Sequence, residues 1–237
     1  MKGDLEKEIN VRGISRLCHF TPSRNFGHII ATGSGILSTK ALKNDERAVY
    51  NQTDLQRLDA HPDHICCSIE YPNAWYLDRA REKDRLFKDW VVLFLSPQLI
   101  LRPGTLFSPR NAAAGMGAHL KPGVEGFVKM YAPEIVGAYN KKFTRSATHL
   151  AAAPTDQQAE VLVPDTVVRE EILGIAVVSE DQARNEVLRL KLMGSSANGL
   201  QIIIAPALFD KNALNVAIRS GLRPKEVKYD IGGADGT

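Results

Sequence analysis

A glutamine and a glutamate stand two residues apart where a polar loop meets an apolar strand. Gln158 and Glu160 come just before the apolar run 161–163, which Pro164 closes. Because residues i and i+2 of an extended chain point to the same side, we expect the amide and the carboxylate to face one cleft. The carboxylate can stabilise an oxocarbenium-like cation, while the amide can read a polar target. A solvated strand end would show the same short pattern.

A second polar pair lies near the N-terminus. His19 and Thr21 share one side of a predicted strand just before a turn, and Asn25 begins the next predicted helix. Imidazole and hydroxyl groups both donate and accept hydrogen bonds, so this pair could hold a ribose hydroxyl and a carboxamide. A structural histidine at a strand end is the alternative interpretation.

The composition is that of a globular protein. The chain has 237 residues, of which 44% are hydrophobic and 24% are charged, and this excludes a disordered or fibrous protein. No apolar run reaches eighteen residues and the N-terminus is charged, so we expect no membrane segment and a cytoplasmic protein. Three cysteines and six irregularly spaced histidines fit neither a disulfide framework nor a zinc site, so we expect no metal.

Two stretches concentrate positive charge, although the formal net charge is only +3. The stretch 79–85 mixes both signs and is typical of a solvated helix face. The second contains Lys141, Lys142 and Arg145 beside Tyr139 and has few acidic residues. It could contact the phosphates of a nucleic acid, or it could be a solvated surface.

The hydrophobic pattern predicts short strands that outnumber the long helices. The predicted strands cover 15–20, 64–69, 90–95, 104–107, 161–163, 172–178 and 201–205, and the predicted helices cover 25–32, 75–85, 179–193 and 209–220. We expect a polar leader before 15, a long loop over 40–63 with a possible helix at 53–58, and irregular structure with short helices over 108–154. Strands and helices do not alternate regularly, which indicates an α+β fold with a mixed or antiparallel sheet. We expect one domain over 1–237, with a core of about 14–205 and a C-terminal helix and frayed tail over 206–237.

An ordered series of short motifs resembles the DarT family of DNA ADP-ribosyltransferase toxins. The series consists of 19–26 (HFTPSRNF), 35–37 (GIL), 71–73 (YPN), 158–160 (QAE) and 173–180 (LGIAVVSE). The resemblance covers roughly residues 14 to 192. It implies a fold like that of the poly(ADP-ribose) polymerases and transfer of ADP-ribose from NAD to a base in single-stranded DNA. It also implies a partner, the DarG antitoxin, whose macrodomain removes the modification.

The resemblance also implies roles for single residues. Glu160 matches the catalytic glutamate, and Gln158 matches the end of the loop that recognises the acceptor. His19 and Thr21 would bind the ribose and the amide of nicotinamide, with Asn25 in support.

Further roles follow from the same resemblance. Tyr71 would line the nicotinamide pocket. The family uses an arginine in the segment that corresponds to 40–63, where Arg57 is the best match and Arg47 the reserve. On the acceptor side, the expected DNA contacts are Lys141, Lys142 and Arg145, with Tyr139 stacking on a base.

The acceptor base stays open between guanine and thymine. Residues 66–70 (CCSIE) stand where thymidine-modifying members tend to carry aromatic residues, which favours guanine. An ADP-ribosyltransferase with a protein or RNA acceptor, and a non-catalytic module that binds NAD or nucleic acid, are the competing interpretations.

Overall fold

The computed structural model describes residues 2–44, 58–84, 87–137, 140–197 and 199–231. The helices are α1 (Lys2–Arg12), α2 (Ser23–Ala31), α3 (Thr39–Asn44), α4 (Ala74–Lys83), α5 (Gly123–Lys129), α6 (Glu180–Leu192) and α7 (Lys211–Arg219), with short 3-10 helices at η1 (Pro97–Leu101), η3 (Arg169–Glu171) and η4 (Pro206–Phe209). The strands are β1 (Leu17–Pro22), β2 (Ile36–Leu37), β3 (His64–Ile69), β4 (Trp90–Leu95), β5 (Leu106–Ser108), β6 (Lys121–Pro122), β7 (Glu134–Val136), β8 (Lys142–Thr144), β9 (Glu160–Pro164), β10 (Thr166–Val167), β11 (Ile172–Val177), β12 (Gln201–Ile204) and β13 (Val227–Lys228).

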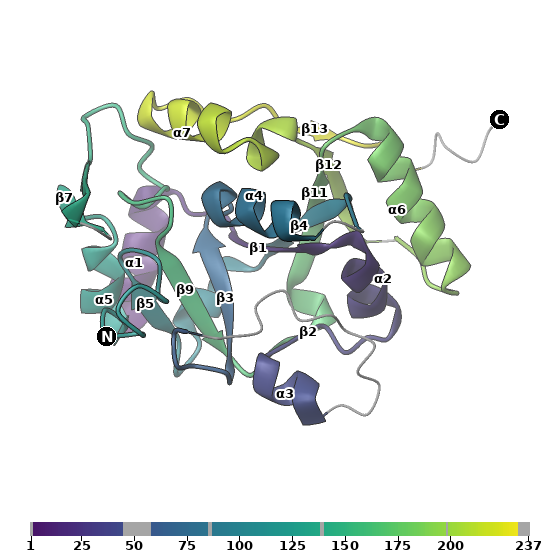
Figure 1. Ribbon diagram of the computed structural model, residues 1–237, viewed down its shortest axis with the longest axis horizontal. Helices are drawn as coiled ribbons and strands as arrows, with labels where there is room; N and C mark the ends of the chain where they lie inside the picture. Colours follow the sequence, from purple (N-terminus) through teal and green to yellow (C-terminus); the bar gives the residue numbers. More distant parts are fainter. Residues whose placement is uncertain (1, 45–57, 85–86, 138–139, 198, 232–237) are drawn as a thin grey trace.

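One large sheet organises the described chain (Figure 1). Its strand order is β13-β12-β11-β4-β1-β3-β9-β5-β6. Strands β11 and β12 pair in parallel, whereas β1 and β4 pair antiparallel, so the sheet is mixed. The predicted α+β class with a mixed sheet is therefore confirmed.

Helices cover both faces of this sheet. Neighbouring residues of β4 pack into the apolar clusters on the two opposite faces. Val91 belongs to one buried apolar cluster, together with Phe26 of α2. Val92 belongs to a second cluster, together with Leu77 of α4 and Leu214 of α7. A strand that is buried on both faces has no polar side to show, which is why β4 is a continuous apolar run.

Several predicted elements are confirmed at their expected places. Strands β3 and β4 have the predicted bounds. The predicted N-cap of α6 is also present, because the Ser179 hydroxyl accepts the Gln182 N–H at 3.2 Å. The possible helix at 53–58 lies outside the described residues except for residue 58.

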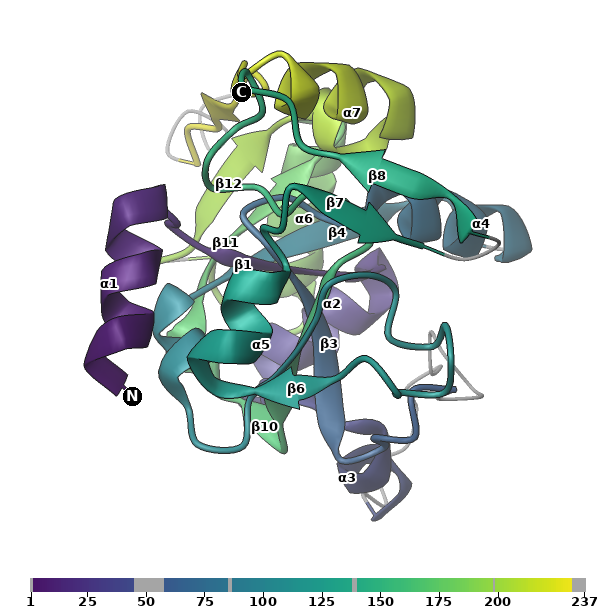
Figure 2. The same ribbon diagram turned by 90° about the vertical axis from the view of Figure 1, so that its left-hand side faces the viewer.

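The polar leader was predicted wrongly, since residues 2–12 form α1. Over residues 3–12 of this helix, only Leu5 and Ile9 are buried, while Val11 is exposed. Two apolar residues at a spacing of four give too narrow a stripe to stand out in the sequence. Figure 2 shows α1 lying beside α5, which is one of the short helices that we expected within 108–154.

Within the described ranges, no helix combines the length and the apolar character needed to cross a bilayer.

Candidate active site

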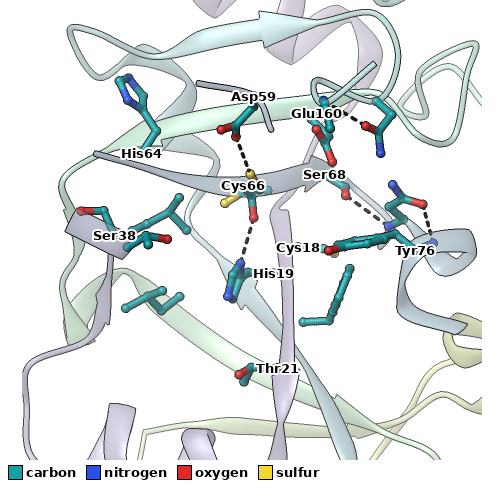
Figure 3. Close-up of a pocket in the computed structure, with 18 of the residues that line it drawn as sticks. Cys18, His19, Thr21, Ser38, Asp59, His64, Cys66, Ser68, Tyr76 and Glu160 are labelled. Atoms are coloured by element: carbon teal, nitrogen blue, oxygen red, sulfur yellow. Dashed lines mark hydrogen bonds between the residues drawn. The ribbon is translucent and has the colours of Figure 1, made fainter. Parts of the chain in front are cut away.

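A cavity of about 500 Å³ lies where β1, β3 and the start of β9 face α4 and the segment after α2 (Figure 3). Five of the residues predicted from the sequence line it together. They are His19, Thr21, Asn25, Gln158 and Glu160. These residues come from segments more than 130 positions apart, and pairing of β1 with β3 and of β3 with β9 brings them together.

Glu160 is the first residue of β9 and lies opposite Ser108 of β5. Its side chain is only 9% exposed. The backbone N–H of Ala112 donates to Glu160 Oε2 at 2.8 Å, which fixes the orientation of the carboxylate. A buried, oriented carboxylate at a cavity wall can stabilise a positive charge that develops beside it.

The hydrogen bond of His19 determines its tautomer. His19 Nδ1 lies 2.8 Å from the carbonyl oxygen of Cys66, so Nδ1 carries the proton and donates. In a neutral ring, Nε2 is then an acceptor and suits a hydroxyl donor such as that of a ribose. Asn25 Nδ2 donates to Thr21 Oγ1 at 3.0 Å, so these two cavity residues orient each other.

Gln158 reaches the cavity from a turn, not from an extended strand. Asp156 Oδ1 accepts the Gln158 N–H at 2.9 Å, and the Asp156 carbonyl accepts the Ala159 N–H at 3.0 Å. The extended-chain argument for the pair Gln158 and Glu160 therefore had the wrong local geometry, although both residues line the cavity. Asp156 is 2% exposed, and its burial raises the pKa of its carboxyl group to about 6.

The aromatic wall of the cavity differs from the prediction. Tyr71 is outside the lining and is 4% exposed, with its ring centroid 5.7 Å from the Arg16 guanidinium carbon. Trp75 and Tyr76, at the start of α4, line the cavity instead. After β3 the chain bends at residues 70–71, and Asn73 then begins α4 by accepting the Tyr76 N–H at 3.0 Å.

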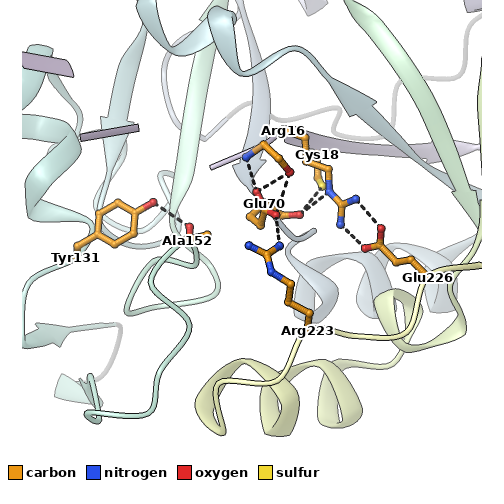
Figure 4. Close-up of polar contacts among 8 residues, drawn as sticks. Arg16, Cys18, Glu70, Tyr131, Ala152, Arg223 and Glu226 are labelled. Atoms are coloured by element: carbon orange, nitrogen blue, oxygen red, sulfur yellow. Dashed lines mark hydrogen bonds and ion pairs between the residues drawn. The ribbon is translucent and has the colours of Figure 1, made fainter. Parts of the chain in front are cut away.

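The bend after β3 is held by charged side chains around the buried Glu70 (Figure 4). Glu70 is 1% exposed and has a backbone φ of 63°, which is uncommon for a residue with a side chain. Its carboxylate accepts from Ser15 N–H and from Arg223 Nη1, both at 2.8 Å. Arg16 Nε donates to the Glu70 carbonyl at 2.9 Å and its guanidinium pairs with Glu226. The segment that leads into α4 is thus tied to the C-terminal part of the chain.

The three basic residues expected to contact DNA are placed away from the cavity lining. Lys142 pairs with Glu134 at 3.0 Å, an acidic neighbour that only the pairing of β7 with β8 brings close. Lys141 Nζ lies 5.3 Å from the centroid of the Phe143 ring. Arg145 donates to backbone carbonyls, and burial lowers its pKa. These carbonyls belong to Leu150, Ala151 and Ala153.

Three further predicted residues, Arg57, Arg47 and Tyr139, lie outside the described residues. Conversely, the structure adds residues of α4 to the lining. Arg79 and Lys83 come from the mixed-charge stretch that was interpreted as a solvated helix face. Together with Trp75 they recur at a spacing of four, and this was the signal in the sequence that they share one side of a helix.

Three possible metal ligands lie close together near one end of β3. Single ligand atoms of His61, Asp63 and His64 fall within 4.8 Å of one another. The irregular histidine spacing did not indicate this group. Both ring nitrogens of His64 lie near protein oxygens, with Nδ1 2.7 Å from Asp63 Oδ1 and Nε2 3.2 Å from the Gly104 carbonyl.

Solved structures resemble this chain in fold. One is Thermosipho africanus DarTG in complex with ADP-ribose, at 17% identity and a TM-score of 0.58, covering 82% of this chain and 51% of that one. The chain thus matches about half the length of that relative. Another is Thermus sp. 2.9 DarT in complex with NAD+, at 18% identity and a TM-score of 0.53, covering 82% of this chain and 97% of that one. A third is Thermus sp. 2.9 DarT in complex with ADP-ribosylated ssDNA, at 16% identity and a TM-score of 0.54, with coverages of 83% and 97%.

No curated protein matches the sequence. The model of one family, described as ssDNA thymidine ADP-ribosyltransferase, DarT, matches residues 18–210. This match spans most of the chain and includes every cavity residue named above. The chain therefore belongs to the DarT family of ssDNA ADP-ribosyltransferases.

Proposed function

We propose that this chain transfers ADP-ribose from NAD to a base of single-stranded DNA and releases nicotinamide. The observation that carries the proposal is that Glu160 shares a cavity with His19 and Thr21. A volume of about 500 Å³ lies within the range of small-molecule and cofactor sites. The lining offers hydroxyl, imidazole, amide and aromatic groups, which suit the sugar hydroxyls, the carboxamide and the flat cationic ring of NAD.

In this mechanism the residues of the cavity hold the dinucleotide and stabilise charge. His19 Nε2 accepts a ribose hydroxyl, and Thr21, oriented by Asn25, binds the nicotinamide amide. Tyr76 offers its ring face to the nicotinamide. As the bond from ribose C1′ to the nicotinamide nitrogen breaks, nicotinamide leaves with the electron pair. Glu160 stabilises the positive charge that grows on the ribose.

The second half of the reaction joins the acceptor base to C1′. A base nitrogen attacks C1′, and Glu160 accepts the proton that this nitrogen loses. Gln158 reads the base, because its amide both donates and accepts hydrogen bonds. Single-stranded DNA suits the site, since an unpaired base reaches a cavity with little unstacking cost. Arg57 would position a phosphate or the base.

The acceptor base is thymine or guanine. The family description names thymidine. The lining at this place contains Cys66, Cys67 and Ser68 and no aromatic residue, which favours guanine. Mapping the modified nucleotide in oligonucleotides that contain one base type each decides between the two.

We also propose a partner and a place of action. The Thermosipho africanus structure is of DarTG, and by analogy a DarG-type antitoxin with a macrodomain would oppose this chain. An enzyme that consumes NAD and modifies DNA would act in the cytoplasm, where both substrates occur in a bacterial cell. We propose that residues 1–237 form one catalytic domain.

The decisive experiment is incubation of the purified chain with NAD and single-stranded oligonucleotides, followed by mass spectrometry. We expect a mass gain of one ADP-ribose on DNA, and loss of this gain in Glu160→Ala. The matched control is Glu125→Ala, which removes an exposed glutamate of α5 and should keep full activity. Transfer to RNA or protein but not to DNA would support the alternative acceptors. Binding of NAD without any transfer would support a non-catalytic module.

A further inference from the structure

Helix α4 presents an exposed stripe of one aromatic and two basic side chains at the cavity. Trp75, Arg79 and Lys83 all line the cavity, and all three are exposed. Residues spaced by four lie above one another on a helix and are separated by about 6 Å along the axis. The stripe is therefore long enough to contact more than one phosphate group.

The charge of this stripe is not neutralised by its own helix. Asp78 of α4 pairs with Lys211 at 2.5 Å, and Asp84, just after the helix, pairs with Arg24 at 3.2 Å. Within the described ranges, no carboxylate lies within ion-pair distance of Arg79 or Lys83. Both cations remain available to an anionic ligand.

The remaining carboxylate of the helix, Glu82, is not among the residues that line the cavity, so both charged residues that α4 contributes to the lining are positive. The pKa of Lys211 is raised mainly by its hydrogen bond to Asp78, and to a lesser degree by the charges of Asp78 and Glu82. Figure 1 shows α7 beside α4, where Lys211 pairs with Asp78 and neutralises its charge. The cavity side of α4 thus carries net positive charge.

Trp75 adds an aromatic surface to the two cations. Its side chain is 38% exposed, a high value for the largest apolar side chain. Lys211 Nζ lies 5.3 Å from the centroid of its ring, but this ammonium group is already paired with Asp78. Aromatic rings interleaved with cations are the combination that binds single-stranded nucleic acid, because bases stack on the rings while phosphates contact the charges.

We propose that this stripe of Trp75, Arg79 and Lys83 binds the acceptor DNA strand next to the modified base. Trp75 stacks on a neighbouring base, and Arg79 and Lys83 hold backbone phosphates. The proposal rests on the proposed function, because it names the surface that delivers the strand to the same cavity. It also replaces the expectation that Lys141, Lys142 and Arg145 supply the main phosphate contacts.

Exposure favours the DNA strand over the diphosphate of NAD as the ligand of these cations. Thr21 and Asn25, proposed to hold the dinucleotide, are 3% and 8% exposed, whereas the α4 stripe is open to solvent. A dinucleotide is largely enclosed by its site, while a polymer must enter from solvent and leave on both sides.

The test measures binding of a fluorescent mixed-sequence oligonucleotide by anisotropy over a salt series, without NAD. The variants are Arg79→Ala/Lys83→Ala and Trp75→Ala. The matched control is Lys7→Ala/Arg184→Ala, which removes two exposed charges on α1 and α6. Binding of NAD to the same variants is measured by calorimetry in a Glu160→Ala background. Thermal melting checks that each variant is folded.

We expect the double variant on α4 to lose about tenfold in DNA affinity, and the slope of log K against log salt to fall by about 1.4, or about 0.7 per phosphate contact. Trp75→Ala should lose about tenfold without a change of slope. The control variant should bind within about twofold of the wild type, and NAD affinity should not change.

Two outcomes would overturn the inference. Unchanged DNA binding in the α4 variants would exclude the stripe as the strand surface. A loss of NAD affinity with intact DNA binding would assign the cations to the NAD diphosphate. The transfer assay with the wild-type protein tests the proposed function separately. Transfer of ADP-ribose to DNA would establish that function whatever the α4 variants do. Absence of transfer would overturn the function itself.

Discussion

Gln157 Nε2 donates to Asn215 Oδ1 at 2.7 Å and thereby joins the loop that carries Gln158 to helix α7. The same loop is fixed at its start, where Thr155 Oγ1 donates to the Ala132 carbonyl at 2.7 Å. A loop held at two points loses little entropy when it binds a base, which is one way to obtain specificity.

Replacement of Asn215 should therefore affect acceptor recognition more than NAD chemistry. We expect Asn215→Ala to raise KM for DNA and thereby lower kcat/KM about 3- to 10-fold. The reason is that one hydrogen bond, worth about 0.5–1.5 kcal/mol, is lost. Hydrolysis of NAD without an acceptor should be unchanged. Asn212→Ala, an exposed residue of the same helix, is the control. Equal losses in transfer and NAD hydrolysis would show that Asn215 serves general stability instead.

The buried carboxyl group of Asp156 should give the protein a specific pH dependence. Its pKa is raised by burial from 3.8 to about 6. Between these pH values the folded state keeps a proton that the unfolded chain has lost. The free energy of unfolding therefore falls as the pH rises from about 4 to about 6. Above pH 6 the full destabilisation caused by the buried, charged carboxylate is present.

Asp156→Asn keeps the side-chain oxygen that accepts the Gln158 N–H but removes the charge. We expect the variant to be more stable than the wild type by about 1–3 kcal/mol at pH 7.5, with no difference near pH 4. Urea unfolding at both pH values measures this. Burial lowers the pKa of His149 to about 4, so this residue makes the free energy of unfolding rise with pH. Because His149 is present in both proteins, its contribution cancels in the difference between them. Equal stabilities at pH 7.5 would contradict the prediction.

Arg145 should behave as a structural residue and not as a DNA contact. Its guanidinium donates to the carbonyls of Leu150 and Ala153, both at 2.8 Å. We expect Arg145→Ala to lower the free energy of unfolding by about 1–3 kcal/mol, because partly buried carbonyls lose their donors. Arg145→Lys should recover only part of this, since an ammonium group cannot span several carbonyls. A variant with unchanged Tm and weakened DNA binding would restore the original prediction for this residue.

Arg223 should stabilise the bend at residues 70–71 before α4. Its partner Glu70 is 1% exposed, so removal of the guanidinium leaves a buried carboxylate with fewer donors. We expect Arg223→Ala to lower the free energy of unfolding by about 1–3 kcal/mol. Arg184→Ala, which removes an exposed i,i+3 partner of Asp181, should change it by less than about 0.5 kcal/mol. Chemical denaturation of both variants gives the comparison.

The sequence determined the parts of this protein that depend on local pattern. The continuous apolar run of β4, the capping pair of Ser179 and Gln182, and the order of the short motifs were all visible without a structure. Hydrophobic period and capping chemistry act over a few residues, so a single sequence records them. The same local pattern located Glu160 at the junction of a loop and a strand.

Only the tertiary structure decided which side chains meet. Tyr71 and Tyr76 are both aromatic residues after β3, yet Tyr76 lines the cavity while Tyr71 is buried outside the lining. Lys142 and Lys83 are both basic, yet pairing of β7 with β8 gives Lys142 a carboxylate partner while Lys83 faces the cavity. A periodic pattern fixes the side of a helix or strand on which a residue lies. The partner of that residue depends on which distant segment packs against that side. Such long-range packing leaves no local signal in the sequence.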